Sequence, residues 1–267
     1  MSALGADGRL IDTHCHLDML QYPVADALQD AARAGLAGVI TVGIDAASSR
    51  RAVELAESYA AAPEGVAVWA TVGLHPHDAL RWDDALAAEL RQLAGTPRVV
   101  AIGECGLDYY RDLSPRDAQV QAFVAQLDLA RQLGKPVVVH VREAADDALT
   151  LLAAHGDGLT IVLHCFSAPP ALAECVERGY LVSFAGNVTY KNAADLRAAA
   201  RAVPDELLLL ETDAPFLTPV PYRGRTNMPG LVVHTAALVA EVRGQDGREL
   251  ADLTSRNAAR VFRLEGA

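Results

Sequence analysis

The stretch VVAIGECGLDYYRDLSPRDAQVQAFVAQLDLARQLGKPVVVHVR, residues 99–142, decides the fold. Residues 99–103 and 136–139 are short, Val-rich runs of the kind that form buried strands. Between them, residues 117–133 place apolar side chains at helical spacing, on a broad face made of Val120, Phe123, Val124, Leu127, Leu129 and Ala130. A strand, a helix and a second strand predict parallel pairing, because a parallel return needs a long crossover.

The same alternation extends along the chain. Further strand candidates are residues 9–12, 38–42, 66–72, 160–163, 180–184 and 207–210, and residues 46–61 are a further helix candidate. Eight such strands close most naturally into an α/β fold of the TIM type, a (β/α)8 barrel with parallel strands. An open doubly wound sheet is the alternative, but no G-x-G-x-x-G or G-x-x-x-x-G-K-[ST] loop follows an early strand. We expect residues 1–267 to form a single domain.

Composition restricts the class of protein further. The chain is 51% hydrophobic and 21% charged, which suits a large core and not a disordered chain. Its formal net charge of -11 cannot attract nucleic acid through the overall field, so a polyanionic substrate would need local cations. The sequence has neither a signal peptide pattern nor an apolar run of membrane-spanning length. We therefore expect a cytoplasmic protein without membrane association, and infer no obligate protein partner.

Polar residues end most of the strand candidates, and the active site of a TIM-type barrel lies at the C-terminal ends of its strands. The first strand runs into D-T-H-C-H, the third into H-P-H, and the loop at residues 212–230 after the eighth is long enough to be functional. Six of the eight histidines lie at such ends, namely His14, His16, His75, His77, His140 and His164. The carboxylates at the same ends are Glu104, Glu211 and Asp213.

Spacing predicts that part of this set chelates metal. His14 and His16 stand two residues apart, so on a strand they share a face and can bind one ion. His140 and His164 follow adjacent strands, while Glu104 and Asp213 add oxygen donors. Six ligands exceed the needs of one tetrahedral ion, which favours two divalent ions that share a carboxylate, with a single ion as the alternative.

Glu104 is the expected bridge, because its strand lies across the barrel mouth from the first strand and beside the fifth. One ion would bind His14, His16, Glu104 and Asp213, and the other would bind Glu104, His140 and His164. A carboxylated lysine cannot replace Glu104, since the two lysines stand at position 135, at the opposite rim, and at position 191, after the seventh strand. Imidazole-rich ligation favours zinc, manganese or iron over magnesium.

The chain has four cysteines, Cys15, Cys105, Cys165 and Cys175. They are too few and too scattered for a disulfide framework, so we expect reduced thiols. Three of them directly follow one of the predicted ligands. Because successive strand side chains point to opposite faces, these three are expected to turn toward the helix layer and away from the metals.

With these motifs the chain resembles the TatD-type metal-dependent deoxyribonucleases of the amidohydrolase-like barrel superfamily. The resemblance rests on IDTHCHLD (11–18), VGLHPHDA (72–79), residues 101–144, LHCFSA (163–168) and LLLETDAPFLTPVPYRGRTNMPG (208–230). It implies divalent metal at His14, His16, Glu104, His140, His164 and Asp213, and it allows magnesium. One departure is PYRGR where many relatives have PYRGK, so Arg225 keeps the charge but offers a planar fork of donors.

The expected reaction is hydrolysis of phosphodiester bonds in DNA by a metal-activated hydroxide, with Glu104 and Asp213 as the catalytic carboxylates and Asp213 holding or accepting the proton. The expected substrate-binding residues are His75, His77, Arg142, Arg223 and Arg225. Aromatic residues are only 5% of the chain, which excludes an extended stacking platform. Tyr109, Tyr110, Phe166 and Tyr190 could stack one or two bases, or line the core instead, so DNA ends or short single strands are favoured.

Two other functions fit the same residues. A metal-activated hydroxide also attacks carbonyl carbon, so an amide, lactone or aminoacyl-ester hydrolase, such as an aminoacyl-tRNA deacylase, is the first alternative. The loop with Arg223 and Arg225 favours a phosphate instead. The second alternative is a non-catalytic binding barrel, which the complete ligand set disfavours.

Overall fold

The computed structural model describes residues 10–60 and 65–264. This part of the chain forms eight parallel strands, each paired with the next in chain order. The strands are β1 (Leu10–Cys15), β2 (Leu36–Val42), β3 (Ala67–Val72), β4 (Val99–Asp108), β5 (Val137–Arg142), β6 (Ile161–Leu163), β7 (Leu181–Phe184) and β8 (Leu208–Leu210). The predicted TIM-type (β/α)8 barrel is confirmed.

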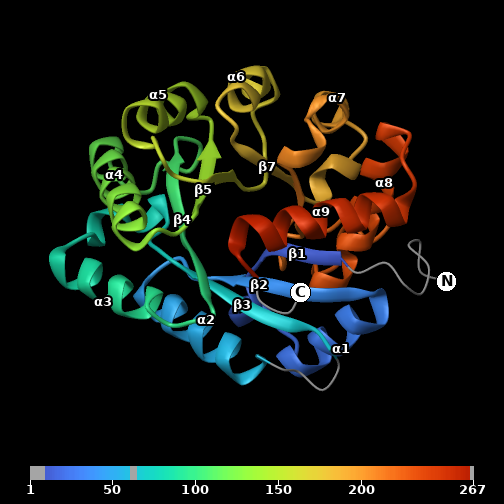
Figure 1. Ribbon diagram of the computed structural model, residues 1–267, viewed down its shortest axis with the longest axis horizontal. Coiled ribbons are helices and arrows are strands. Elements are labelled where there is room, and N and C mark those ends of the chain that lie inside the picture. Colours follow the sequence, from blue (N-terminus) through green and yellow to red (C-terminus); the bar gives the residue numbers. More distant parts are fainter. Residues whose placement is uncertain (1–9, 61–64, 265–267) are drawn as a thin grey trace.

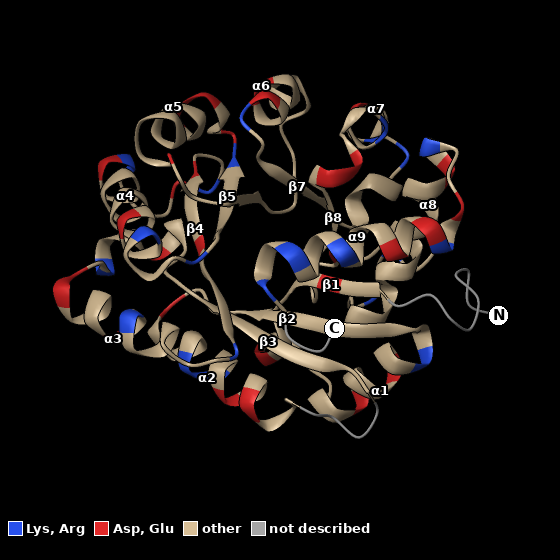
Figure 2. Ribbon diagram, in the orientation of Figure 1, with Lys and Arg blue, Asp and Glu red and all other residues tan. Residues whose placement is uncertain are grey.

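Helices surround the strands in an outer ring (Figure 1). They are α1 (Val24–Ala34), α2 (Ala46–Ser58), α3 (Asp84–Ala94), α4 (Arg116–Leu133), α5 (Ala145–His155), α6 (Leu172–Glu177), α7 (Ala194–Ala202), α8 (Val232–Arg243) and α9 (Gly247–Phe262). Charged residues lie mainly on these helices and the loops, while the strands are largely uncharged (Figure 2). No helix in the described ranges combines the length and apolar character needed to cross a membrane.

Strands β1, β4 and β5 continue beyond the predicted ends at residues 12, 103 and 139 to Cys15, Asp108 and Arg142. Polar side chains interrupt the apolar runs there, but the backbone stays paired. The helix predicted over residues 46–61 ends earlier, because Tyr59 leaves the helical conformation at φ -114° and ψ 27°. Residues 9 and 61, at two of the predicted ends, lie outside the described residues.

The seam between β8 and β1 is closed by the chain that follows β8. The Asp213 amide donates to the His14 carbonyl at 2.9 Å, and the His16 amide donates to the Ala214 carbonyl at 2.7 Å. The Thr13 hydroxyl adds a bond to the Leu210 carbonyl at 2.9 Å. Closure therefore fixes Asp213 beside both histidines of β1.

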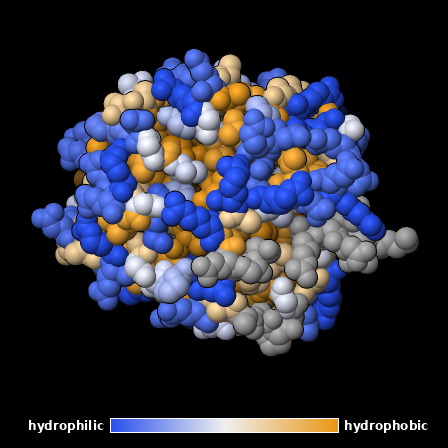
Figure 3. Space-filling model, viewed as in Figure 1, coloured by the Kyte–Doolittle hydropathy of each residue, from blue (hydrophilic) through white to orange (hydrophobic). Residues whose placement is uncertain are grey.

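Two apolar layers hold the barrel. Its interior is filled by one residue or two from every strand, among them Ile40, Trp69 and Val138. Helix α9 packs Val261 and Phe262 against this interior layer, so α9 covers the N-terminal opening of the barrel (Figure 1). The larger core lies between strands and helices. The face viewed in Figure 3 is mostly hydrophilic, with smaller hydrophobic areas between the hydrophilic residues.

Helix α4 differs in detail from its predicted apolar face. Phe123 and Leu127 are buried as predicted, but Val120 and Val124 are half-buried. The buried positions include Gln119 and Gln126 instead. Each glutamine side chain binds backbone groups at the barrel mouth, so polar residues are buried here because they are hydrogen-bonded.

Candidate metal centre

Glu104 lies at the centre of the residues that the strand ends bring together. Its Oε2 atom is 3.4 Å from His14 Nε2 and 3.8 Å from His16 Nε2. Its Oε1 atom is 2.8 Å from both His140 Nδ1 and His164 Nε2. The two carboxylate oxygens thus face two separate pairs of imidazoles, and the side chain is buried.

Asp213 completes the first of these groups. Its Oδ1 atom is 3.5 Å from His16 Nε2 and 3.8 Å from His14 Nε2. Ligand atoms about 2.0 to 2.2 Å from a tetrahedral ion are roughly 3.4 Å from one another, so these separations suit an ion between them. In the second group, the distance of 3.1 Å between His140 Nδ1 and His164 Nε2 is that of a hydrogen bond.

The outer ring nitrogen of three histidines is held by an acceptor. His16 Nδ1 lies 3.2 Å from the Val42 carbonyl. His140 Nε2 lies 3.2 Å from Asp108 Oδ2, and His164 Nδ1 lies 3.3 Å from Glu211 Oε1. A carbonyl or carboxylate holds a proton on that nitrogen, so the other nitrogen faces Glu104 and can offer its lone pair to a metal ion once it has lost its own proton.

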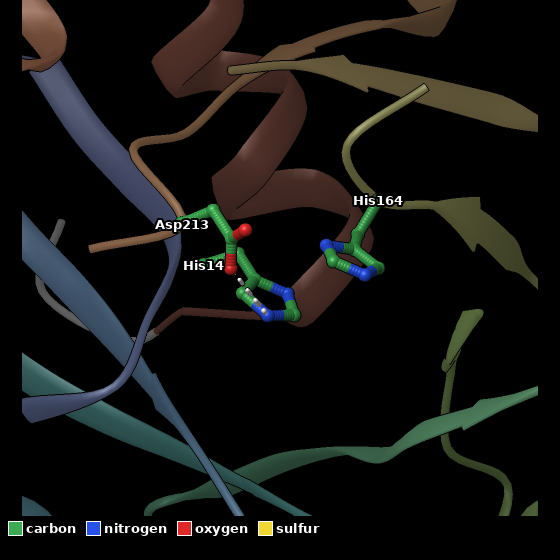
Figure 4. Close-up of side chains that lie close together, drawn as sticks. All are labelled: His14, His164 and Asp213. Atoms are coloured by element: carbon green, nitrogen blue, oxygen red, sulfur yellow. Dashed lines mark ion pairs between the residues drawn. The ribbon is translucent and has the colours of Figure 1, made fainter. Parts of the chain in front are cut away.

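His14 provides the test of whether a metal ion fits. Both of its ring nitrogens are fully buried and have no hydrogen-bond partner among the described residues. Its ring stacks on His164 with centroids 3.9 Å apart and faces Asp213 (Figure 4). A buried nitrogen without a partner is costly. Two carboxylates and several imidazole lone pairs around it form a donor set that suits a divalent cation.

The electrostatics of the site agree with this fit. Burial lowers the pKa of His14, with the neighbouring His164 adding to the effect. Burial alone would also lower the pKa of His164, but Glu104 and Glu211 raise it well above the usual value. Burial acts to raise the pKa of Glu104, yet the surrounding histidines hold it well below its usual range. Glu104 is therefore an anion that attracts positive charge.

The backbone around Glu104 is shaped for this position. The pairing of β4 with β5 shifts register between Ile102 and Cys105, which is a bulge beside the glutamate. Gly103 and Gly106 flank it with φ of +132° and +137°, a conformation that favours glycine. A Cβ on Gly106 would lie 2.1 Å from the His140 carbonyl oxygen. These glycines let β4 approach β5 closely and bring Glu104 to His140.

Asp213 itself has an uncommon backbone conformation, with φ of +55°. Asp and Asn tolerate this left-handed region better than most residues, at a cost of about 1 to 3 kcal/mol. Burial acts to raise the pKa of Asp213, but its contacts with His16 and His14 lower it, so it is ionised. The side chain is 15% exposed and lines a cleft of about 560 Å³, which we call the central cleft.

His75 and His77, predicted to bind substrate, lie next to the metal centre. His75 Nδ1 accepts a hydrogen bond from the His77 amide at 3.1 Å, so its Nε2 carries the proton. This Nε2–H lies 3.3 Å from Glu104 Oε1. Burial lowers the pKa of His75 to about 4, which keeps the ring neutral. His75 is thus a hydrogen-bond donor, while His77 Nε2 binds Asp108 at 2.9 Å.

The three predicted arginines are not equivalent. Arg142 lines the central cleft and lies over the Tyr110 ring at 3.9 Å. Arg223 and Arg225 are exposed, lie over Tyr190 and Tyr222, and are not among the residues that line this cleft. The loop therefore holds its two cations beside the cleft and not in its wall.

The central cleft opens over the candidate metal centre. Its lining includes Arg111, Asn187 and Phe216. Phe216 is 52% exposed, and its ring lies edge-on to His16 with centroids 6.1 Å apart. An exposed aromatic ring beside the metal centre is a surface on which a base can stack.

Of the aromatic residues predicted to stack bases, Tyr110 is exposed at this rim. The Tyr109 hydroxyl binds Asp147 at 2.8 Å, and the Tyr190 hydroxyl binds the Thr218 carbonyl at 3.2 Å. Phe166 is buried against Phe184, so it belongs to the core.

The cysteine prediction is confirmed for Cys15 and Cys105, which are buried in the core between strands and helices. It is wrong for Cys165, which is partly exposed and lines the central cleft. The reason is that β6 ends at Leu163, so strand alternation no longer applies two residues later.

Sequence reasoning missed three residues of the site. Asp108 accepts from His77 and His140, Glu211 accepts from His164 and the Cys165 amide, and Phe216 lines the cleft. Glu211 was noted at a strand end but given no role. A signal existed for Asp108, which stands four residues after Glu104 in a short run that ends in two tyrosines.

A (β/α)8 barrel with imidazoles and carboxylates converging at the C-terminal rim is an architecture used for metal-dependent hydrolysis. The sequence model of the family described as "TatD related DNase" matches residues 11–263. The chain belongs to this family, so the expected class, a nuclease among the metal-dependent hydrolases, is confirmed at the level of the family.

Similar proteins agree with the family. The uncharacterized metal-dependent hydrolase YabD of Bacillus subtilis is 36% identical over 259 residues, 96% of this chain and 99% of that protein. The 3′-5′ ssDNA/RNA exonuclease TatD of Musicola paradisiaca is 42% identical over 241 residues, 88% of this chain and 89% of that one. The crystal structure of YJJV, a TatD homolog from Escherichia coli, has a TM-score of 0.88 and 31% identity, and covers 96% of this chain and 98% of that one.

Proposed function

We propose that this chain is a metal-dependent exonuclease that hydrolyses phosphodiester bonds at the ends of DNA or of short single strands. The observation that carries the proposal is the position of Glu104, whose two oxygens face two separate pairs of imidazoles. We assign one divalent ion to His14, His16, Glu104 and Asp213, and a second to Glu104, His140 and His164.

When bound, such ions would supply a Lewis acid that withdraws charge from phosphoryl oxygens and acidifies water. The chain's own residues select the ion. Imidazole nitrogens favour zinc, manganese or iron over magnesium. Asp108 and Glu211 orient His140 and His164 by holding the protons on their outer nitrogens.

Asp213 is proposed to accept the proton of the attacking water. It is ionised, it reaches the central cleft, and closure of the barrel fixes it beside His14. A general base must lie within hydrogen-bond reach of the proton that it removes, and Asp213, which is 15% exposed against 4% for Glu104, is the more accessible carboxylate of the ligand group.

The substrate phosphate is proposed to bind between His75 and Arg142. The neutral His75 ring directs an N–H into the centre, and Arg142 presents a guanidinium in the cleft wall. Arg111, in the same wall, adds a cation that sequence reasoning did not select. His77 would support this contact through Asp108.

The bases of the substrate would lie outside the proposed phosphate position between His75 and Arg142. Phe216 offers an exposed ring for the terminal base, and Tyr110, which follows β4, offers a second. Arg223 and Arg225 would contact backbone phosphates further along the strand, beyond the cleft. The exonuclease name of the relative from Musicola paradisiaca supports a strand end as substrate, and leaves DNA and RNA both as candidates.

The test is an assay of metal-loaded protein against end-labelled single-stranded DNA, duplex DNA, RNA and aminoacyl-tRNA. We expect stepwise shortening of the single strands and no turnover by Glu104→Gln. Glu57→Gln, the same change on the exposed side of α2, serves as the control and should retain full activity. Hydrolysis of the aminoacyl ester without phosphodiester cleavage would reject the proposal and favour the carbonyl hydrolase.

A further inference from the structure

A second polar cleft lies at the opposite end of the barrel from the metal centre. It has a volume of about 250 Å³ and is lined where β5 and β6 begin and where α4 and α9 end. Its lining includes four basic side chains, Arg131, Lys135, Arg260 and Arg263, and we call it the basic cleft. Figure 2 shows basic residues on α9 where this helix crosses the barrel.

The charge of the basic cleft is not balanced by the chain. No acidic residue is among those that line it, although the whole chain carries a net charge of -11. Arg131 pairs with Asp128 at 2.7 Å. Within residues 10–60 and 65–264, the other three cations form no ion pair with a carboxylate. Among the described residues, these four cations therefore form one ion pair with a carboxylate, that of Arg131 with Asp128.

Helix ends explain part of this arrangement. Arg131 and Arg260 stand in the last turns of α4 and α9, where a cation complements the partial negative charge of the helix dipole. Arg131, Lys135 and Arg260 also donate to backbone carbonyls. Two half charges at helix ends, together with the Asp128 carboxylate, are smaller than the four full positive charges present, so a net positive charge remains.

Lys135 and Arg263 are the two cations of the basic cleft whose charge is least compensated by other groups. Burial lowers the pKa of Lys135, and the charge of Arg263 lowers it further. Arg263 follows the end of α9 and is exposed. Its guanidinium has no hydrogen-bond partner among the described residues. A bound anion would relieve the repulsion and use these free donors.

We propose that the basic cleft binds a phosphate group. The planar guanidinium fork of arginine can donate to two oxygens of one phosphate group, and Lys135 adds a compact charge. The volume is below the range of about 300 to 1,000 Å³ that is typical of drug-sized ligands, so the cleft accepts a phosphoryl group with little more attached. Inorganic phosphate, a nucleotide and a strand end share this chemistry.

The basic cleft is separate from the catalytic residues. Pro136 and Thr160 in its lining precede β5 and β6, whereas His140 and His164 stand at the other ends of these strands. Occupation of the basic cleft therefore does not block the central cleft. Its variants are expected to leave hydrolysis of a small phosphodiester, bis(p-nitrophenyl) phosphate, unchanged.

The test is calorimetric titration of the metal-loaded full-length protein with three probes, namely inorganic phosphate, a nucleoside monophosphate and a short single-stranded oligonucleotide. Arg263→Glu should weaken binding of at least one probe about tenfold or more. The matched control is Arg256→Glu, the same charge change at an exposed position of α9 outside the basic cleft, and it should bind like the unaltered protein.

Lys135→Gln gives a second, independent variant should Arg263→Glu fail to fold, and it should weaken the same probe. The probe that is affected identifies the source of the phosphate. Equal affinity of the unaltered protein and both cleft variants for all three probes would overturn the proposal, because the cations would then serve the helix ends alone. An equal loss in Arg256→Glu would overturn it as well, because bulk charge would explain the binding.

Discussion

Asp108 places its Oδ2 atom 3.2 Å from His140 Nε2, on the side of the ring opposite to Glu104. The same oxygen lies 2.9 Å from His77 Nε2, and Oδ1 accepts from the Tyr110 and Arg111 amides. Burial acts to raise the pKa of Asp108, but these contacts lower it well below its usual value. A buried anion thus fixes which nitrogen of His140 faces the metal centre.

Asp108→Asn is expected to disturb the centre without removing a proposed ligand. The amide oxygen can keep the two backbone bonds, which turns the amide nitrogen, a donor, toward His140. The ring must then move its proton to Nδ1, where the lone pair for the metal is needed. Metal affinity should fall about 10- to 100-fold. Titration with metal measures this, with Asp157→Asn, an exposed carboxylate after α5, as the control. Equal affinity in both variants would contradict the role of Asp108.

Asp213→Asn should abolish most of the hydrolysis while the fold persists. Asparagine tolerates the positive φ of this position, so the closure between β8 and β1 is retained. Loss of a general base lowers kcat by about 10²- to 10⁴-fold. Single-strand hydrolysis and thermal unfolding should be measured together, against Asp195→Asn on the exposed side of α7. A kcat within a factor of about two of the unaltered protein would exclude Asp213 as the base.

Metal binding should release protons at neutral pH. Burial acts to lower the pKa of His16, His140 and His164, but neighbouring carboxylates raise it above the usual value when no metal is bound. A raised pKa means that these rings still hold protons above about pH 6.5, and a cation must displace them. The apparent affinity should therefore increase as the pH rises through and above that value. Calorimetry at pH 7 in buffers of different ionisation enthalpy counts the protons, and a count of zero would contradict the assignment.

Phe216→Ala should distinguish a base-stacking surface from a structural residue. Stacking of one base on an aromatic ring contributes about 1 to 3 kcal/mol, so KM for single-stranded DNA should rise about 5- to 150-fold. Hydrolysis of bis(p-nitrophenyl) phosphate, which has no base, should be unchanged. Leu80→Ala, another exposed apolar residue, is the control. A parallel loss on both substrates would indicate that Phe216 supports the site and does not stack bases.

The sequence was sufficient to predict those parts of the structure that follow from the spacing of apolar residues and from the order of strands and helices. Val-rich runs alternating with amphipathic segments predict the barrel, and polar residues at the ends of these runs predict the rim where His14, Glu104 and His164 meet. This works because every parallel strand of the barrel ends at the same rim, so position along the chain becomes position in space.

Other features depend on contacts between distant residues. β4 extends beyond its predicted end because a polar residue and two glycines interrupt its apolar run, whereas in the barrel these glycines admit the backbone of β5. Gln119 and Gln126 were not predicted to be buried. Their burial depends on hydrogen bonds to backbone groups of distant residues, which the sequence pattern of the helix does not reveal. Arg223 and Arg225 lie in an irregular loop that has no repeating pattern of apolar residues, so their stacking on tyrosines could not be predicted.

The central claim, that Glu104 bridges two cations, is tested most directly by anomalous diffraction from crystals grown with manganese or zinc and measured at the absorption edge of that metal. The account predicts two peaks, one between Glu104, Asp213 and the two histidines of β1, and the other between Glu104, His140 and His164. A single peak, or peaks that do not touch Glu104, would contradict it.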